Sequence, residues 1–225
     1  MLNIVYIKLI IIASLIAMLS IARMNYDNKQ SSIELPANFT STPAKFMKII
    51  WGQTQGLGAD FSFINAISLY YNAQHATKNQ NAYWNALADK FFLAQKLDPQ
   101  FYDTYHIGIG TLAYDAKRPD KSIQLAYMGT EALPLNWQIP FIGGFIAHDL
   151  GHDEHNAAKL MKIASNIPKA PTMAVSLASR FLENDINSQE AIAFLRQMLH
   201  ILPKEYHAGI QRRLKELQKP HSTKD

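Results

Sequence analysis

The sequence has no cysteine among its 225 residues. This absence excludes disulfides, cysteine-ligated zinc, iron–sulfur clusters, thiol catalysis and a lipid-modified cysteine anchor. Charge is also sparse, because charged residues make up only 18% of the chain and the net charge is +4. A basic cluster at Arg212, Arg213, Lys215 and Lys219 lies beside acidic residues in a polar helical stretch, without any nucleic-acid motif. We therefore expect this cluster to form a solvated face, with no nucleic-acid partner.

Motifs of common catalytic sites are lacking as well. The chain contains no Gly-x-Ser-x-Gly elbow, no phosphate-binding loop and no dinucleotide-binding fingerprint. Two short glycine-containing stretches, 56–60 and 108–110, have no preceding strand and are too short to cradle a phosphate. We expect no cofactor and no catalytic residues. Apolar residues make up 48% of the chain, which suffices for a hydrophobic core.

The N-terminal segment, residues 1–24, is strongly apolar, and Lys8 is the only charged side chain among its first 22 residues. About 20 apolar residues span a bilayer core, which favours a transmembrane anchor. A signal peptide cleaved after Ala22 is the alternative, because the apolar run from Leu9 has the length of a signal-peptide core. We favour the anchor, since no basic region precedes the apolar stretch. Residues 25–43 form a polar linker.

This interpretation predicts a single-pass protein of the inner (cytoplasmic) membrane, with its body on the extracytoplasmic, periplasmic side. The stretch that follows the linker, AKFMKIIWG at 44–52, combines two lysines with large apolar side chains. We interpret it as a first packing helix, with contact to the membrane surface as the alternative reading.

From residue 59 onward, the spacing of apolar residues is helical and no segment alternates strictly, which predicts an all-α body. Four prolines that follow apolar helical stretches recur at intervals of 35, 34 and 35 residues, namely Pro99, Pro134, Pro168 and Pro203. A two-helix repeat of about 34 residues is typical of a helical solenoid.

Three positions upstream of each proline recur in the second helix of the repeat. They are Leu87, Phe91 and Ala94; Ser122, Ala126 and Gly129; Ala157, Met161 and Ala164; and Ala191, Leu195 and Met198. This pattern resembles the tetratricopeptide (TPR) repeat. Ile109-Gly110, Gly143-Gly144 and Ala178-Ser179 occupy the family's Leu-Gly position, where small residues let two helices cross closely. The hallmark Trp is missing, Pro140 falls in or at the start of a first helix, and a long loop over about 72–81 breaks the period.

The resemblance implies a helix-hairpin solenoid of about three to four TPR-like repeats over residues 44–203. It also implies a capping helix at 204–219, with a tail at 220–225. In that family, protein partners bind the face lined by the first helices. Carried over to this chain, the binding positions are Ile107, Thr111, Tyr114, Gln138, Phe141, Phe145, His148, Arg180 and Glu183, together with Thr104, Met173 and Ser176. For Phe141 and Phe145, packing between repeats is the competing interpretation.

A histidine-rich stretch supports an alternative function. His148 and His152 are four residues apart, as in zinc proteases, and His155 offers a third ligand, which would suit a metal-dependent hydrolase. However, Gly151 is expected to lie in the turn between two helices, which would break the helix that such a motif needs. We therefore expect a membrane-anchored, non-catalytic adaptor that binds a protein partner and supports assembly of an envelope complex, with no metal site.

Overall fold

The computed structural model describes residues 6, 12, 14–24 and 43–218, and within these residues every regular element is a helix. The all-α prediction is therefore confirmed for this part of the chain. The helices are α2 (Ala44–Trp51), α3 (Gln55–His75), α4 (Gln80–Leu97), α5 (Tyr102–Gly110), α6 (Pro119–Ala132), α7 (Gln138–Asp149), α8 (Glu154–Asn166), α9 (Thr172–Asp185), α10 (Ser188–Ile201) and α11 (His207–Gln218). Three short helices, η1 (Gly52–Thr54), η2 (Thr111–Asp115) and η3 (Lys204–Tyr206), adjoin them.

The N-terminal segment is described only in part. Residues 14–24 are helical and exposed. Among the described residues, no helix combines the length and the apolar character that a membrane span needs. The expected anchor over 1–24 lies partly outside the described residues, as does nearly all of the linker over 25–43. The tail at 220–225 lies entirely outside them.

The repeated prolines mark the ends of helices. Helices α4, α6, α8 and α10 each end two residues before a proline, namely Pro99, Pro134, Pro168 and Pro203. A proline lacks the backbone N–H that would continue a helix, so this spacing sets where every second helix stops. Pro140 lies in the first turn of α7, where the missing N–H breaks no helical hydrogen bond.

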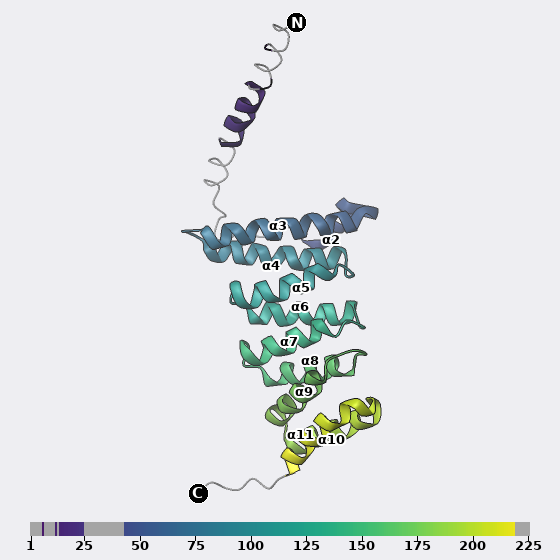
Figure 1. Ribbon diagram of the computed structural model, residues 1–225. Helices are drawn as coiled ribbons and strands as arrows, with labels where there is room; N and C mark the ends of the chain where they lie inside the picture. Colours follow the sequence, from purple (N-terminus) through teal and green to yellow (C-terminus); the bar gives the residue numbers. More distant parts are fainter. Residues whose placement is uncertain (1–5, 7–11, 13, 25–42, 219–225) are drawn as a thin grey trace.

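Consecutive helices pack as antiparallel pairs that follow one another along the molecule, from α3–α4 at one end to α9–α10 at the other, where α11 follows (Figure 1). Each helix packs mainly on its neighbours in sequence, and α5 also contacts α7, as α9 contacts α11. The order of contacts in space thus repeats the order in the chain.

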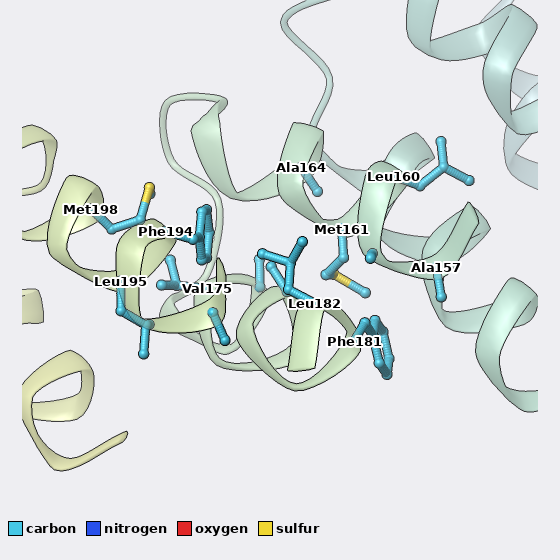
Figure 2. Packing of buried hydrophobic residues seen from close by; sticks show 14 of the residues in the cluster. Ala157, Leu160, Met161, Ala164, Val175, Phe181, Leu182, Phe194, Leu195 and Met198 are labelled. Carbon is cyan, nitrogen blue, oxygen red and sulfur yellow. The ribbon is translucent and has the colours of Figure 1, made fainter. Parts of the chain in front are cut away.

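In the described residues, the buried apolar side chains form three core clusters along this row of helices. The three recurring positions of the second helices are buried in all four pairs. Fully burying one large apolar side chain contributes about 1.5–3 kcal/mol, which applies to the larger of these residues, such as Phe91, Met161 and Leu195. Figure 2 shows the part of the core to which α8, α9 and α10 contribute, with Met161 beside Leu182.

Glycines permit the closest approaches between helices. A Cβ atom on Gly143 of α7 would lie 2.5 Å from the Cβ of Ala126 in α6, and one on Gly144 would lie 3.1 Å from the backbone nitrogen of Met161 in α8. The expectation of close crossing at this pair is confirmed. At Gly110 it is wrong, because a Cβ there would meet no atom within 4 Å. The close contact in that hairpin is made by Gly108, whose Cβ would lie 2.8 Å from Leu125.

The long loop expected over about 72–81 is also shorter than predicted. Helix α3 continues to His75 and α4 begins at Gln80, so only four residues connect them. Within this connection Asn79 has a φ of 53°. Asparagine tolerates this left-handed conformation better than most residues, which explains the tight turn.

Candidate protein-binding face

The first helix of each pair lies beside the first helix of the next pair. The hydroxyl of Tyr102 in α5 donates a hydrogen bond to Oε1 of Gln138 in α7 at 3.0 Å. The ring of His148 in α7 stacks on Phe181 of α9, with centroids 4.5 Å apart. Side chains therefore connect α5 to α7 and α7 to α9. We call the exposed sides of α5, η2, α7 and α9 the first-helix face.

Six of the expected binding residues are exposed on this face, one of which is Met173 at the start of α9. Ile107 and Tyr114 are 38% and 43% exposed, and Phe145 is 42% exposed. Gln138 and Arg180 are also exposed. Large apolar side chains at this level of exposure leave area that a partner can bury.

A π-helical turn shapes the first part of the face. In η2 the backbone N–H of Ala116 donates to the carbonyl of Thr111 at 3.0 Å, which widens the last turn of the helix that begins as α5. Such turns are rare and are often found at functional sites. The turn carries half-buried Thr111 and exposed Tyr114, two of the expected binding residues. The sequence pattern did not predict this π-helical turn.

Other expected positions are engaged in packing. Phe141 is half-buried against the core and meets Trp137 edge to face, with centroids 5.7 Å apart. This arrangement fits the alternative interpretation for Phe141, in which it packs between helix pairs. Phe145 does not fit that alternative, because it is exposed. Thr104 is fully buried, so it is not available to a partner. Met173, by contrast, is not engaged in this packing, because it is 56% exposed at the start of α9.

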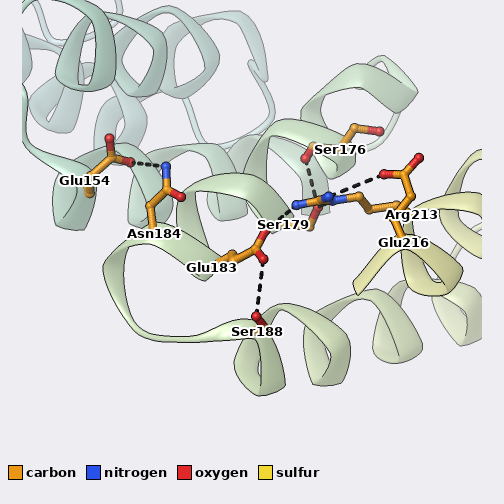
Figure 3. A network of polar contacts seen from close by, with 8 residues as sticks. All are labelled: Glu154, Ser176, Ser179, Glu183, Asn184, Ser188, Arg213 and Glu216. Carbon is orange, nitrogen blue, oxygen red and sulfur yellow. Dashed lines mark hydrogen bonds and ion pairs between the residues drawn. The ribbon is translucent and has the colours of Figure 1, made fainter. Parts of the chain in front are cut away.

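Glu183 belongs to a polar network rather than to an open surface. Its Oε2 lies 2.5 Å from Nη2 of Arg213 in α11, and its Oε1 accepts a hydrogen bond from Ser188 at 3.2 Å. Arg213 also reaches Glu216 of its own helix, and its Nε contacts the hydroxyl of Ser179 (Figure 3). Ser176 accepts a hydrogen bond from Ser179 through its backbone carbonyl at 2.8 Å. The network fixes α11 against α9.

The histidines of the alternative hypothesis have separate surroundings. Nδ1 of His148 lies 2.7 Å from Oε1 of Glu154, and Nδ1 of His155 lies 3.2 Å from Oδ2 of Asp185. His152 is exposed in the α7–α8 turn with a φ of 50°. The same left-handed conformation occurs in two other connections that precede a second helix, at Asn79 and at Lys117, whose φ is 57°. The expected turn at Gly151 is confirmed.

Within the part of the chain that the structure describes, no three His, Asp or Glu side chains are grouped as a metal ion would need. The imidazole contacts instead join α7 to α8 and α8 to α9. The geometry therefore assigns these histidines to helix packing and to a turn.

The polar start of α8 is well defined. A carboxylate oxygen of Asp153, Oδ1, accepts a hydrogen bond from the backbone N–H of Asn156 at 3.0 Å, which caps the helix. This backbone hydrogen bond holds the pKa of Asp153 below its ordinary value. The amide oxygen of Asn156 accepts from the hydroxyl of Tyr127 at 2.6 Å, so the cap is tied to α6. Burial raises the pKa of Tyr127.

Sequence reasoning missed Tyr102 and Trp137, which contact first helices, and Arg213, which fixes α11 against α9. Tyr102 and Trp137 sit at the starts of first helices, and Arg213 was assigned to a solvated basic cluster. The aromatic side chains of Tyr102 and Trp137, just before or within the first turn of a first helix, were the feature of the sequence that could have indicated them. No known protein family's model matches the chain, and no curated protein has a matching sequence.

Proposed function

We propose that the protein is a membrane-anchored, non-catalytic adaptor with a TPR-like helical solenoid that binds a protein partner. Two features support the solenoid interpretation: paired helices at a repeat of 34 or 35 residues, and a last helix held against α9. In such arrays each pair stacks on the next and offers a continuous surface built from equivalent helices.

The observation that carries the proposal is the exposure of three large apolar side chains on the first-helix face. Ile107, Tyr114 and Phe145 are each about two-fifths exposed, although they belong to helices whose opposite sides are buried. Tyrosine and other aromatic residues on a firm helical support are typical of residues that dominate binding energy. These side chains suit the apolar side of an amphipathic helix or of an extended peptide.

The charged positions limit where the partner makes polar contacts. Glu183 is already paired with Arg213, so Arg180 is the expected binding residue of α9 whose charge is exposed. We expect the partner segment to carry an acidic group beside α9. Such a partner is a subunit of a membrane complex, for example in a pilus, secretion or transport machine of the bacterial envelope.

The proposed setting is the inner membrane, with the N-terminal segment as a single-pass anchor and the helical body on the periplasmic side. The apolar composition of residues 1–22 supports this part of the proposal. An anchor raises the effective concentration of the adaptor beside a membrane partner, which compensates for modest affinity.

Site-specific crosslinking in native membranes tests the proposal. A photoreactive amino acid is placed at Phe145 of the full chain, and a control is placed at Ile201, which is 53% exposed on α10. We expect a crosslinked protein at position 145 and none at 201. In the full chain, Tyr114→Ala combined with Phe145→Ala should weaken binding of the identified partner about tenfold or more, because each hot-spot side chain contributes over 1 kcal/mol.

Ile201→Ala is the matched control for the double variant and should leave the affinity unchanged. Capture at both positions, or unchanged binding by the double variant, would show that the partner does not use the first-helix face. Comparing the full chain with one that starts at Gln30 then separates recognition by the helices from recognition by the membrane segment.

A further inference from the structure

Helix α2 exposes more apolar surface than it buries. It packs on the α3–α4 pair through Ala44, Met47 and Trp51, which contact the small cluster of Ala59, Leu93, Ala94 and Leu97. The side of α2 away from this cluster carries three large apolar residues. Phe46, Ile49 and Ile50 are 51%, 77% and 71% exposed.

The charge within α2 has one sign. Lys45 and Lys48 lie in this helix, which has no acidic residue, and the first acidic residue after it is the exposed Asp60 of α3. Nζ of Lys45 is 5.3 Å from the ring centroid of Phe46, so a cation borders the apolar side chains. Lysines beside exposed aromatic and aliphatic residues on a short helix are typical of a helix that lies in the interface of an anionic membrane.

The apolar surface continues onto the start of α3. The rings of Trp51 and Phe61 are 6.2 Å apart, and Phe61 itself is 57% exposed. Leu57 and Ile64, four residues before and three after it on the same side of α3, are each 62% exposed. Trp51 packs against α3 at Gly58. A Cβ atom on Gly58 would lie only 2.6 Å from Cγ of the Trp51 ring, so the ring fills the space that the missing side chain leaves.

The place of α2 in the chain also favours a lipid surface. Eighteen residues, 25–42, separate the apolar N-terminal segment from Pro43. Eighteen residues span at most about 60 Å even when fully extended. A segment inserted in the bilayer would therefore keep α2 within reach of the same membrane.

From these observations we propose that α2 lies on an anionic phospholipid surface. Phe46, Ile49 and Ile50 enter the boundary between headgroups and acyl chains, and Lys45 and Lys48 contact lipid phosphates. The inference rests on the proposed membrane anchor, but not on the partner that the first-helix face binds. It fixes one end of the helical body at the membrane and leaves α5, α7 and α9 accessible.

The absence of cysteine allows a direct test. The full chain carrying Ile49→Cys is labelled with a nitroxide and reconstituted into vesicles of phosphatidylcholine and phosphatidylglycerol. Ile201→Cys, on an exposed position of α10, is the matched control. We expect the label at 49 to collide more often with oxygen than with a water-soluble nickel chelate, and the label at 201 to show the reverse.

Charge is tested in the same background. Replacing both lysines, Lys45→Gln with Lys48→Gln, should lower the ratio of lipid-inserted to water-exposed label at position 49 about tenfold or more. Each basic residue near an anionic surface adds favourable binding energy, which the double variant loses. Vesicles of pure phosphatidylcholine should give a shift in the same direction.

Two results would overturn the inference. In the first, the chain floats with the vesicles while the labels at 49 and 201 are equally accessible to the nickel chelate; the anchor then holds and α2 does not touch lipid. In the second, the label at 49 is immobilised in detergent without lipid, which shows that protein, such as a second copy of this chain, covers α2. Crosslinking at Phe145 tests the proposed function independently of both.

Discussion

Nη2 of Arg213 in α11 lies 2.5 Å from Oε2 of Glu183 in α9, and both side chains are mostly buried, at 16% and 25% exposure. The pair connects the last helix to the first helix of the preceding pair. A carboxylate left in such a place without its partner loses a charged hydrogen bond and stays partly desolvated. The end of the helical row is therefore held by charge as well as by Ile210 and Leu214.

Replacing Arg213 should loosen this end. We expect Arg213→Met to lower the free energy of unfolding by about 1–3 kcal/mol, because the apolar stem is kept while Glu183 loses its partner. Arg212→Met, at an exposed neighbouring position, should stay within about 0.5 kcal/mol of the unmodified chain. Urea unfolding of the full chain in detergent, followed by circular dichroism, measures both. Equal effects of the two substitutions would mean that the pair does not stabilise α11.

Two glycines of the repeat pattern should respond in opposite ways. Gly143→Ala places a Cβ 2.5 Å from that of Ala126, so we expect a loss of about 1–3 kcal/mol from overpacking. Gly110→Ala meets nothing within 4 Å and should gain about 0.5–1 kcal/mol, because alanine favours the helix. The same unfolding measurement decides. A loss at both positions would show that Gly110 also serves a close helix crossing.

The cap of α8 should make stability sensitive to acid. Since the folded state lowers the pKa of Asp153, its contribution is present above the ordinary value of about 3.9 and is lost as the pH falls through the lowered value. Asp153→Asn keeps one oxygen for the backbone cap but loses the oxygen that accepts from the side-chain amide of Asn156 at 2.6 Å. It should therefore cost less than about 1 kcal/mol at neutral pH and remove the pH dependence. Asp153→Ala should cost about 1 kcal/mol at neutral pH.

Unfolding curves of the three chains between neutral pH and the acid limit measure the cap. The difference in the free energy of unfolding between the unmodified chain and Asp153→Asn should become smaller, or change sign, in acid. A difference that is constant with pH would show that the charge on Asp153 does not contribute to the cap.

The histidine stretch should not hold zinc in stoichiometric amounts. His148 and His155 engage different carboxylates and His152 lies in a turn, so binding one ion through all three would require these contacts to break. We expect the full chain, dialysed after exposure to zinc, to retain well under one ion per chain by elemental analysis. One ion per chain, lost in His152→Ala, would instead support the hydrolase hypothesis.

Much of the helical body was predictable because its signals are local and repeated. The prolines at 99, 134, 168 and 203 fix helix ends through the missing N–H, and the turn at Gly151 followed from the same period. Errors arose where one repeat departs from the others. The α3–α4 connection is short because Asn79 adopts a left-handed conformation, and the close crossing in the second hairpin uses Gly108 instead of Gly110.

The candidate face was predictable by position but not by role. Resemblance to a repeat family placed Tyr114 and Phe145 on the first helices, where they are indeed exposed. It could not tell that Thr104 is buried or that Phe141 packs against the core, because exposure depends on how neighbouring helices cross. Arg213 was taken for a solvated charge, and its partner lies thirty residues away.

The sequence by itself determined that the body is helical, where most helices end and which residues form the repeating core. These properties depend on backbone hydrogen bonding and on a fixed apolar period, both of which act over a few residues. The tertiary structure alone decided which polar groups meet, as with Glu183 and Arg213, and which apolar residues remain uncovered, as with Ile49 and Ile50. Both outcomes depend on distances between helices that local sequence does not specify.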